Sequence, residues 1–235
     1  MINKIVGSIE QAVADIQDGA IVMIGGFGPA GLPSELIDGL IAQGAKDLTI
    51  VNNNAGNGDT GLAALLKARR VRKILCSFPR QVDSHVFDAL YRAGDIELEL
   101  VPQGNLAERI RAAGAGIGGF FTRTGFGTQL AEGKETRMIN GRGYVLESPI
   151  HADFALIKAE RADRWGNLVY RKTARNFGPV MATAARCTIA QVGRIVDLGD
   201  FDPEAIVTPG IFVKRVVRVA GSHAGVSNDS QGAAA

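Results

Sequence analysis

The chain has 235 residues, of which 46% are hydrophobic, and its 26 basic residues nearly balance its 24 acidic residues. This composition predicts a globular protein with a sizeable core, consisting of one domain over residues 1–220 and a flexible polar tail over residues 221–235. Nucleic acid and membranes are not expected partners, because no basic block is interleaved with aromatic residues and no apolar run approaches the roughly 18 residues of a membrane span.

The first half of the chain alternates between strand and helix patterns. Short apolar runs predict buried strands over residues 21–24, 48–51, 71–76 and 96–101. A first helix is expected between Ser8, its cap, and Gly19, and later helices begin at signals such as Pro33 or the pair Asn105 and Glu108. This alternation favours an α/β fold, a doubly wound and mostly parallel sheet with helices on both faces.

The character of the chain changes after residue 114. Residues 114–133 are rich in glycine and phenylalanine and predict a long irregular segment, either a functional loop or an arm against another chain. Asn140-Gly141, between two strand-like runs, predicts a β-hairpin. Further strands are expected over residues 154–158, 168–171, 188–192 and 211–219, and a short helix over residues 178–185.

The stretch DGAIVMIGGFGPAGLP, residues 18–33, combines a strand, a glycine-rich loop and the start of a helix. Glycines without Cβ atoms let backbone N–H groups approach a ligand closely. The helix N-terminus that follows favours anions, so the expected ligands are phosphates, carboxylates or a developing oxyanion. A plain tight turn between a strand and a helix would use the same residues.

Gly26, Gly28 and Gly31 also satisfy the dinucleotide-binding pattern G-x-G-x-x-G, which is weak on its own. A nicotinamide-binding unit should carry an acidic residue at the end of its second strand, whereas the second strand here ends in three asparagines. Pro29 removes one of the N–H donors that a pyrophosphate would use. A nucleotide-binding oxidoreductase is therefore the weaker alternative.

Neutral amides follow two of the predicted strands. Asn52, Asn53 and Asn54 end the second strand, and Gln103 and Gly104 follow a later one. Because the carboxyl ends of parallel strands meet at one edge of a sheet, we expect the glycine loop and these amides to converge on one crevice. Amides could orient a carboxylate or a carbonyl without forming an ion pair, or they could make local turns and cap the next helix.

The sequence offers no convincing nucleophile. No G-x-S-x-G elbow occurs, and the apolar surroundings of Cys76 and Cys187 predict buried, inert thiols. The three histidines share no metal-ligand spacing, so no metal site is predicted. Glu132 and Glu147 are the only carboxylates in a suggestive setting, and solvated or paired roles at the surface are favoured for both. The chain therefore predicts a ligand site without a reactive group.

These blocks resemble the A (alpha) chain of the family I coenzyme A transferases. DGAIVMIGGFGPAGLP is similar to the first motif of that family, and NNNAG, PQGNLAERIRAAGAGI, FFTRTGFGT, DFALIKAERADRWGNLVYRKTARNFG and TPGIFV resemble its later blocks in order, over residues 4–219. The family's nucleophile is a glutamate in a Ser-Glu-Asn-Gly motif of the B subunit, and no such motif occurs here. The resemblance thus implies a single CoA-transferase domain that is active only with a B subunit, in a heterodimer or heterotetramer.

The resemblance also implies an activity: a ping-pong transfer of CoA from succinyl-CoA to a 3-oxoacid, through an acyl anhydride and a glutamyl-CoA thioester on the partner. The expected acceptor is 3-oxoadipate, with acetoacetate as the alternative; a non-catalytic CoA-binding module is a more distant one. No cofactor is expected to stay bound, since the CoA thioester is a substrate.

The resemblance also implies the binding residues. The CoA-binding segment carries over onto Gly25, Gly26, Phe27, Gly28, Pro29, Ala30 and Gly31. Substrate-binding residues would be Asn53, Asn54, Gln103 and Gly104, with Arg175 suggested for the distal carboxylate of 3-oxoadipate. The N-terminus has no signal-peptide pattern, so a cytoplasmic location is expected.

Overall fold

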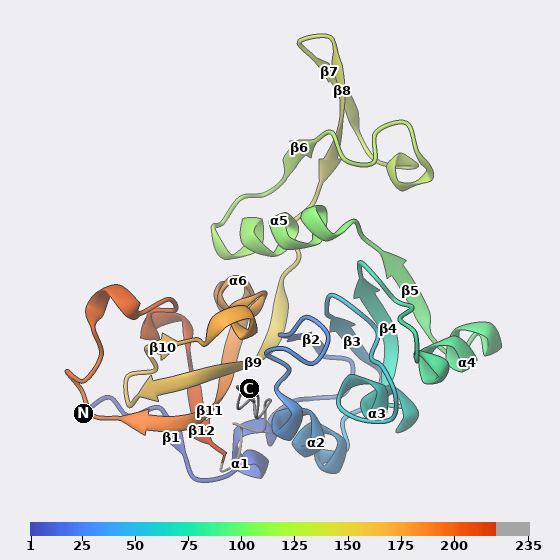
Figure 1. Ribbon diagram of the computed structural model, residues 1–235. Helices are drawn as coiled ribbons and strands as arrows, with labels where there is room; N and C mark the ends of the chain where they lie inside the picture. The colour runs from blue at the N-terminus through green and yellow to red at the C-terminus, as the bar shows by residue number, and fades with distance from the viewer. Residues whose placement is uncertain (220–235) are drawn as a thin grey trace, which may run out of the picture.

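The computed structural model describes residues 1–219 and contains a nine-stranded sheet in the order β1-β12-β11-β9-β2-β3-β4-β5, with β10 paired to β9 (Figure 1). All neighbouring strands on this path are parallel, and only β10 is antiparallel. The strands are β1 (Ile5–Val6), β2 (Ile21–Ile24), β3 (Leu48–Val51), β4 (Val71–Cys76), β5 (Glu97–Leu100), β9 (Ala152–Asp163), β10 (Leu168–Val169), β11 (Ala185–Val196) and β12 (Arg215–Arg218). The predicted α/β fold with a mostly parallel sheet is confirmed.

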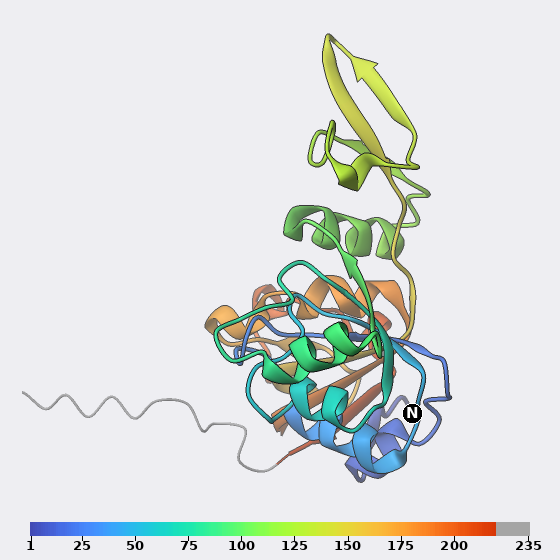
Figure 2. The same ribbon diagram turned by 90° about the vertical axis from the view of Figure 1, so that its right-hand side faces the viewer.

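Helices cover both faces of this sheet. They are α1 (Ile9–Val13), α2 (Ser34–Gln43), α3 (Leu62–Lys67), α4 (His85–Ala93), α5 (Gln103–Gly114) and α6 (Gly178–Ala184). Successive strand residues point to opposite faces, so Val22 and Ile24 of β2 share a core with α1 to α4, whereas Met23 shares a second core with α5 and α6. Figure 2 shows α5 and α6 stacked on the opposite side of the sheet from α1 and α2. Both cores hold the carboxyl ends of β2 to β5 in place.

A second sheet projects from the body above α5 (Figures 1 and 2). Its three antiparallel strands, in the order β6-β8-β7, are β6 (Phe120–Thr122), β7 (Thr136–Ile139) and β8 (Arg142–Glu147). The turn at Asn140-Gly141 has φ values of 50° and 72°, as the predicted hairpin requires. We call residues 120–147 the arm.

Several element boundaries differ from the prediction. Helix α1 ends at Val13 instead of continuing towards Gly19, and β9 and β11 extend to 12 residues each because they pair with each other along their whole length. Helix α5 begins at Gln103, so Gln103 lies on the first helical turn rather than in a loop. The predicted tail, residues 221–235, lies outside the described residues. In the part of the chain described, no helix is long and apolar enough to cross a membrane.

Candidate functional site

The glycine loop forms a tight reversal directly after β2. Phe27 and Ala30 exchange backbone hydrogen bonds, with N–O distances of 3.0 and 3.3 Å. Gly26, Gly28 and Gly31 all have positive φ, at 122°, 58° and 74°. At Gly31 a Cβ atom would lie 2.4 Å from the backbone oxygen of Ala174, so only glycine fits there. The loop therefore presents backbone at its surface, and the Phe27 side chain is half exposed at its edge.

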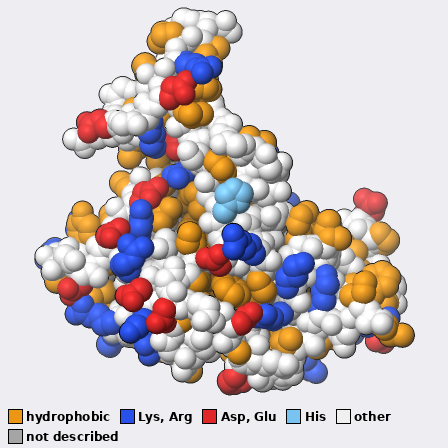
Figure 3. Space-filling view, turned by 180° about the vertical axis from the view of Figure 1, so that it is seen from behind, with side chains coloured by type: hydrophobic (Ala, Val, Ile, Leu, Met, Phe, Trp, Pro, Cys, Tyr) orange, Lys and Arg blue, Asp and Glu red, His pale blue; other side chains and the backbone are white. Residues whose placement is uncertain are grey.

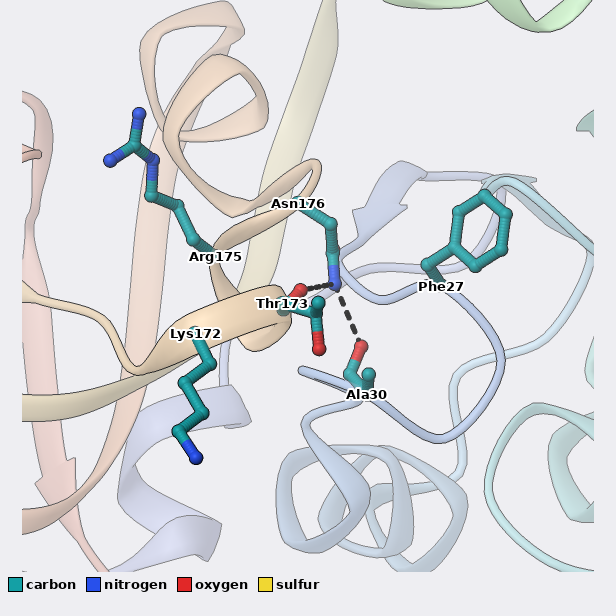
Figure 4. Close-up of a pocket in the computed structure, with 6 residues that line it drawn as sticks. All are labelled: Phe27, Ala30, Lys172, Thr173, Arg175 and Asn176. Carbon is teal, nitrogen blue, oxygen red and sulfur yellow. Dashed lines mark hydrogen bonds between the residues drawn. The ribbon is translucent and has the colours of Figure 1, made fainter.

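A distant segment packs against this loop. It comprises the 3₁₀ turn η2 (Lys172–Arg175) and Asn176, which precede α6. The Asn176 side-chain amide donates to the backbone oxygens of Ala30, at 2.9 Å, and of Thr173, at 2.7 Å (Figure 4). The hydrogen bond to Ala30 joins residues 146 positions apart in the sequence, so it ties the glycine loop to η2.

The loop and η2 border a pocket of about 670 Å³ (Figure 4). Two cationic side chains, Lys172 and Arg175, line it, and no acidic one does. Both are exposed, and in Figure 4 they extend from η2 in different directions. The full lining consists of Phe27, Ala30, Lys172, Thr173, Arg175 and Asn176. Charge and backbone together suit an anionic ligand with an apolar part.

The three asparagines after β3 are buried, and each has a different task. The Asn52 side chain donates to the Ile24 backbone oxygen at the end of β2, at 2.7 Å, and thereby joins the two strand ends. Asn54 accepts from the Gly56 backbone N–H at 2.9 Å, a local turn of the predicted kind. Asn53 is 2% exposed, and its side-chain oxygen accepts from Ser77 and Gln103.

The contact between Asn53 and Gln103 joins β3 to the first turn of α5. The Gln103 Nε2 atom donates to the Asn53 Oδ1 atom at 2.9 Å, and the Ser77 hydroxyl donates to the same oxygen at 2.7 Å. Among the described residues, these side-chain hydrogen bonds of Asn53 use only its oxygen, so its NH₂ group is available to donate elsewhere. Gln103 is exposed, and a Cβ atom at Gly104 would meet nothing within 4 Å. The exposed Gln103 and the buried Asn53 thus place neutral amide groups at the start of α5.

The structure brings the predicted residues together in two groups. Asn53 and Gln103 meet directly, but neither lines the pocket at the glycine loop, where Arg175 lies, so the expected single crevice of glycine loop and amides is not seen in this pocket. Sequence reasoning missed Ser77, Asn176 and Lys172. Ser77 could have been found as the residue directly after a predicted strand, but nothing local in the sequence places Asn176 against Ala30.

Other candidate reactive groups are engaged elsewhere. Glu147 is 2% exposed and pairs with Lys134 at 2.9 Å, so the expectation of a surface role for it was wrong. Burial raises the pKa of the Cys76 thiol to about 12, which keeps it protonated and unreactive near neutral pH. Among residues 1–219, no three His, Cys, Asp or Glu side chains are grouped so that they could hold a metal ion.

Known proteins provide the context for this geometry. The family model described as Coenzyme A transferase matches residues 6–219. The A chain of the 3-oxoadipate CoA-transferase of Pseudomonas putida is 71% identical over 224 residues, covering 95% of this chain and 97% of that protein. The A chain of the probable succinyl-CoA:3-ketoacid coenzyme A transferase of Bacillus subtilis is 49% identical over 214 residues, covering 91% and 89%.

The fold matches a solved structure as well. The acyl-CoA transferase YdiF of E. coli O157:H7, solved as a thioester complex with CoA, superposes with a TM-score of 0.81 at 22% identity, over 93% of this chain. The match covers 50% of YdiF, so this chain spans half the length of that enzyme. The chain belongs to the coenzyme A transferase family.

Proposed function

We propose that this chain is the A, or alpha, component of a succinyl-CoA:3-oxoadipate CoA-transferase. The observation that carries the proposal is the 71% identity to the corresponding chain of a 3-oxoadipate CoA-transferase, over nearly the full length of both proteins. The site agrees with it, because it combines a backbone-lined anion pocket with neutral amide donors. The B subunit supplies the attacking glutamate, and the two chains act together in the cytoplasm as a heterodimer or heterotetramer.

The reaction then runs through the partner's carboxylate. The glutamate oxygen attacks the succinyl thioester carbon and expels CoA thiolate, giving an acyl anhydride; the thiolate attacks the glutamyl carbonyl and releases succinate. The acceptor carboxylate next attacks the glutamyl thioester, again expelling CoA thiolate. The thiolate finally attacks the acyl carbon of the second anhydride, which yields 3-oxoadipyl-CoA and restores the glutamate.

This chain contributes binding and charge stabilisation to these steps. Residues 25–31 hold the CoA thioester, and the NH₂ groups of Asn53 and Asn54 with the amide of Gln103 stabilise the oxyanions without trapping a carboxylate in an ion pair. Gly104 leaves room for the acyl chain. Arg175 binds the distal carboxylate of 3-oxoadipate, a role supported by its place in the pocket.

The test is reconstitution with the B subunit from the same organism. We expect no turnover from this chain alone, and CoA transfer from succinyl-CoA when the two chains are mixed. Rates with 3-oxoadipate and acetoacetate decide the acceptor, because both compounds belong to the class of 3-ketoacids for which the Bacillus subtilis relative is named. Faster turnover of acetoacetate would assign that activity instead, and transfer by the isolated chain would refute the proposed division between two chains.

The acceptor role of Arg175 has its own test. Arg175→Ala in the reconstituted enzyme should raise the KM for 3-oxoadipate and leave the KM for acetoacetate unchanged, because acetoacetate has no distal carboxylate. Lys172→Ala is the matched control, since Lys172 lines the same pocket. Unchanged kinetics with 3-oxoadipate in the Arg175 variant would remove this assignment, and an effect of Lys172→Ala alone would transfer it to Lys172.

A further inference from the structure

The arm holds only one buried hydrophobic side chain, Val145 of β8, which is 1% exposed. None of the three hydrophobic core clusters of the described residues includes a residue of β6, β7 or β8, and β7 is exposed along its whole length. A small sheet of this kind needs a packed face to be stable, and the body of the molecule does not provide one. Figures 1 and 2 show it standing clear of the main sheet. The exposed strand β7 is therefore available to a second polypeptide.

The surface of the arm shows which chemistry would cover it. Met138 is 66% exposed and Ile139 38%, directly before the hairpin turn, and Phe126, whose ring lies against Gly143 of β8, is 42% exposed. Figure 3 shows hydrophobic side chains along the arm, with charged ones between them. Arg123 and Arg142 are exposed and have no acidic partner among the described residues, whereas Glu132 is the one exposed carboxylate of the arm there without a basic partner. The arm therefore carries a small excess of basic charge. It fits an apolar surface flanked by carboxylates.

The root of the arm is fixed to the candidate site. The buried Asn105 side chain on α5 donates to Glu147, at 3.1 Å, and to the backbone oxygen of Thr124, at 3.4 Å. Arg109 and Lys134 add ion pairs to Glu147, at 3.7 and 2.9 Å. Asn105 lies two residues after Gln103, which contacts Asn53. The arm thus rises from the same helical turn that carries the substrate-side amide.

We propose that the arm is the docking element for the B subunit. The inference rests on the proposed function, which requires a partner carboxylate to reach Asn53 and Gln103. The root of the arm is hydrogen-bonded to α5, the helix that begins at Gln103. A second copy of this chain is the poorer occupant, because it would present the same basic arm and no nucleophile. In the YdiF relative, where this chain matches half of the sequence, the remaining half belongs to the same polypeptide.

The experiment compares two exposed apolar residues. Met138→Asp places a charge at the arm tip, and Ile211→Asp does the same at a site outside the arm, where Ile211 is 76% exposed. Each variant is titrated with the B subunit for its Kd, and turnover is measured at saturating B subunit. We expect Met138→Asp to raise the Kd about tenfold or more while kcat at saturation stays within about twofold of wild type. Ile211→Asp should leave both unchanged.

Three outcomes would overturn the inference. A wild-type Kd for Met138→Asp, at matched urea stability, would show that the arm does not contact the partner. Loss of self-association by Met138→Asp with an unchanged Kd for the B subunit would assign the arm to a second copy. If the wild-type mixture shows neither binding nor turnover, the proposed function itself is refuted. This failure is distinguishable from failure of the arm proposal, because it is seen with the wild-type chains alone.

Discussion

At the scale of single residues, the chemistry proposed for this chain depends on one hydrogen-bond donor, the side-chain NH₂ group of Asn53. The Asn53 side chain accepts two hydrogen bonds through its oxygen, from Ser77 and Gln103, and the proposed function assigns its NH₂ group to the substrate. Its neutrality matters, because a cation there would hold a substrate carboxylate too tightly in the ground state. The amide is thus oriented by its neighbours before any substrate arrives.

Asn53→Asp tests this role with an isosteric change. The carboxylate keeps both accepted hydrogen bonds, so the fold should survive, but it cannot donate and it repels a substrate anion. We expect kcat of the reconstituted enzyme to fall about 10²- to 10³-fold, the usual effect of losing one oxyanion donor. Asn3→Asp, an exposed amide near the far edge of the sheet, should have no effect. A normal kcat for Asn53→Asp would contradict the assignment.

At the scale of elements, the pocket depends on how closely the glycine loop and η2 approach. Gly31 and Gly28 both have positive φ, but a Cβ atom added at Gly31 would lie 2.4 Å from a backbone oxygen, whereas one added at Gly28 would meet open space. An alanine at Gly28 would therefore introduce backbone strain alone, whereas an alanine at Gly31 would introduce the same strain and a steric clash. They form a natural pair of variants.

Both Gly31→Ala and Gly28→Ala should lose about 1–2 kcal/mol of backbone conformational energy. Gly31→Ala must in addition push η2 away from the loop, so we expect its KM for succinyl-CoA to rise about tenfold, and that of Gly28→Ala to rise far less. Steady-state kinetics of the reconstituted enzyme measure this, with urea unfolding as the stability control. Equal KM values in the two variants would contradict the described packing of η2.

A second link at this scale joins α1 to β12. Arg215 donates to both carboxylate oxygens of Asp15 at 2.6 Å and to the backbone oxygen of Ala12 at 2.9 Å. The hydrogen bonds from Arg215 lower the pKa of Asp15 in the folded state. A lowered folded pKa means that this stabilisation is present above the unfolded pKa of about 4 and is lost as the pH falls through the folded value.

Asp15→Asn should therefore lower the free energy of unfolding by about 0.5–1 kcal/mol at pH 7, a small value because solvent screens this half-exposed pair. The difference from wild type should disappear as the pH is lowered well below 4. Urea unfolding at a series of pH values measures both, with Glu204→Gln, an exposed carboxylate, as the control. A deficit that persists at low pH would show that the ion pair is not its cause.

Contacts of this site were predictable from the sequence where a general rule of parallel sheets places them, and not where they depend on packing between residues far apart in the chain. The strand order placed Asn53 and Gln103 at one sheet edge, because the carboxyl ends of parallel strands share that edge. The start of α5 at Gln103 and the approach of Asn176 to Ala30 were not predicted, since the latter joins residues 146 positions apart and no local pattern encodes it. Glu147 was misjudged for the same reason: its partners Asn105 and Lys134 come from other elements.

At the scale of the whole molecule, the proposed function makes this chain one part of a reaction site shared with a second chain. The sheet and its two cores position the glycine loop, and the lining of the pocket beside that loop contains no carboxylate. The arm extends from the same helix that carries Gln103. This arrangement fits a chain that binds and stabilises while a second chain attacks.

The most direct test of this division of labour locates the covalent intermediate. This chain and its B subunit are mixed with succinyl-CoA in the absence of any acceptor, and the intact mass of each polypeptide is measured. We predict that the mass of CoA, joined as a thioester, is added to the B subunit and that this chain keeps its unmodified mass. A CoA adduct on this chain, with or without the B subunit, would contradict the account.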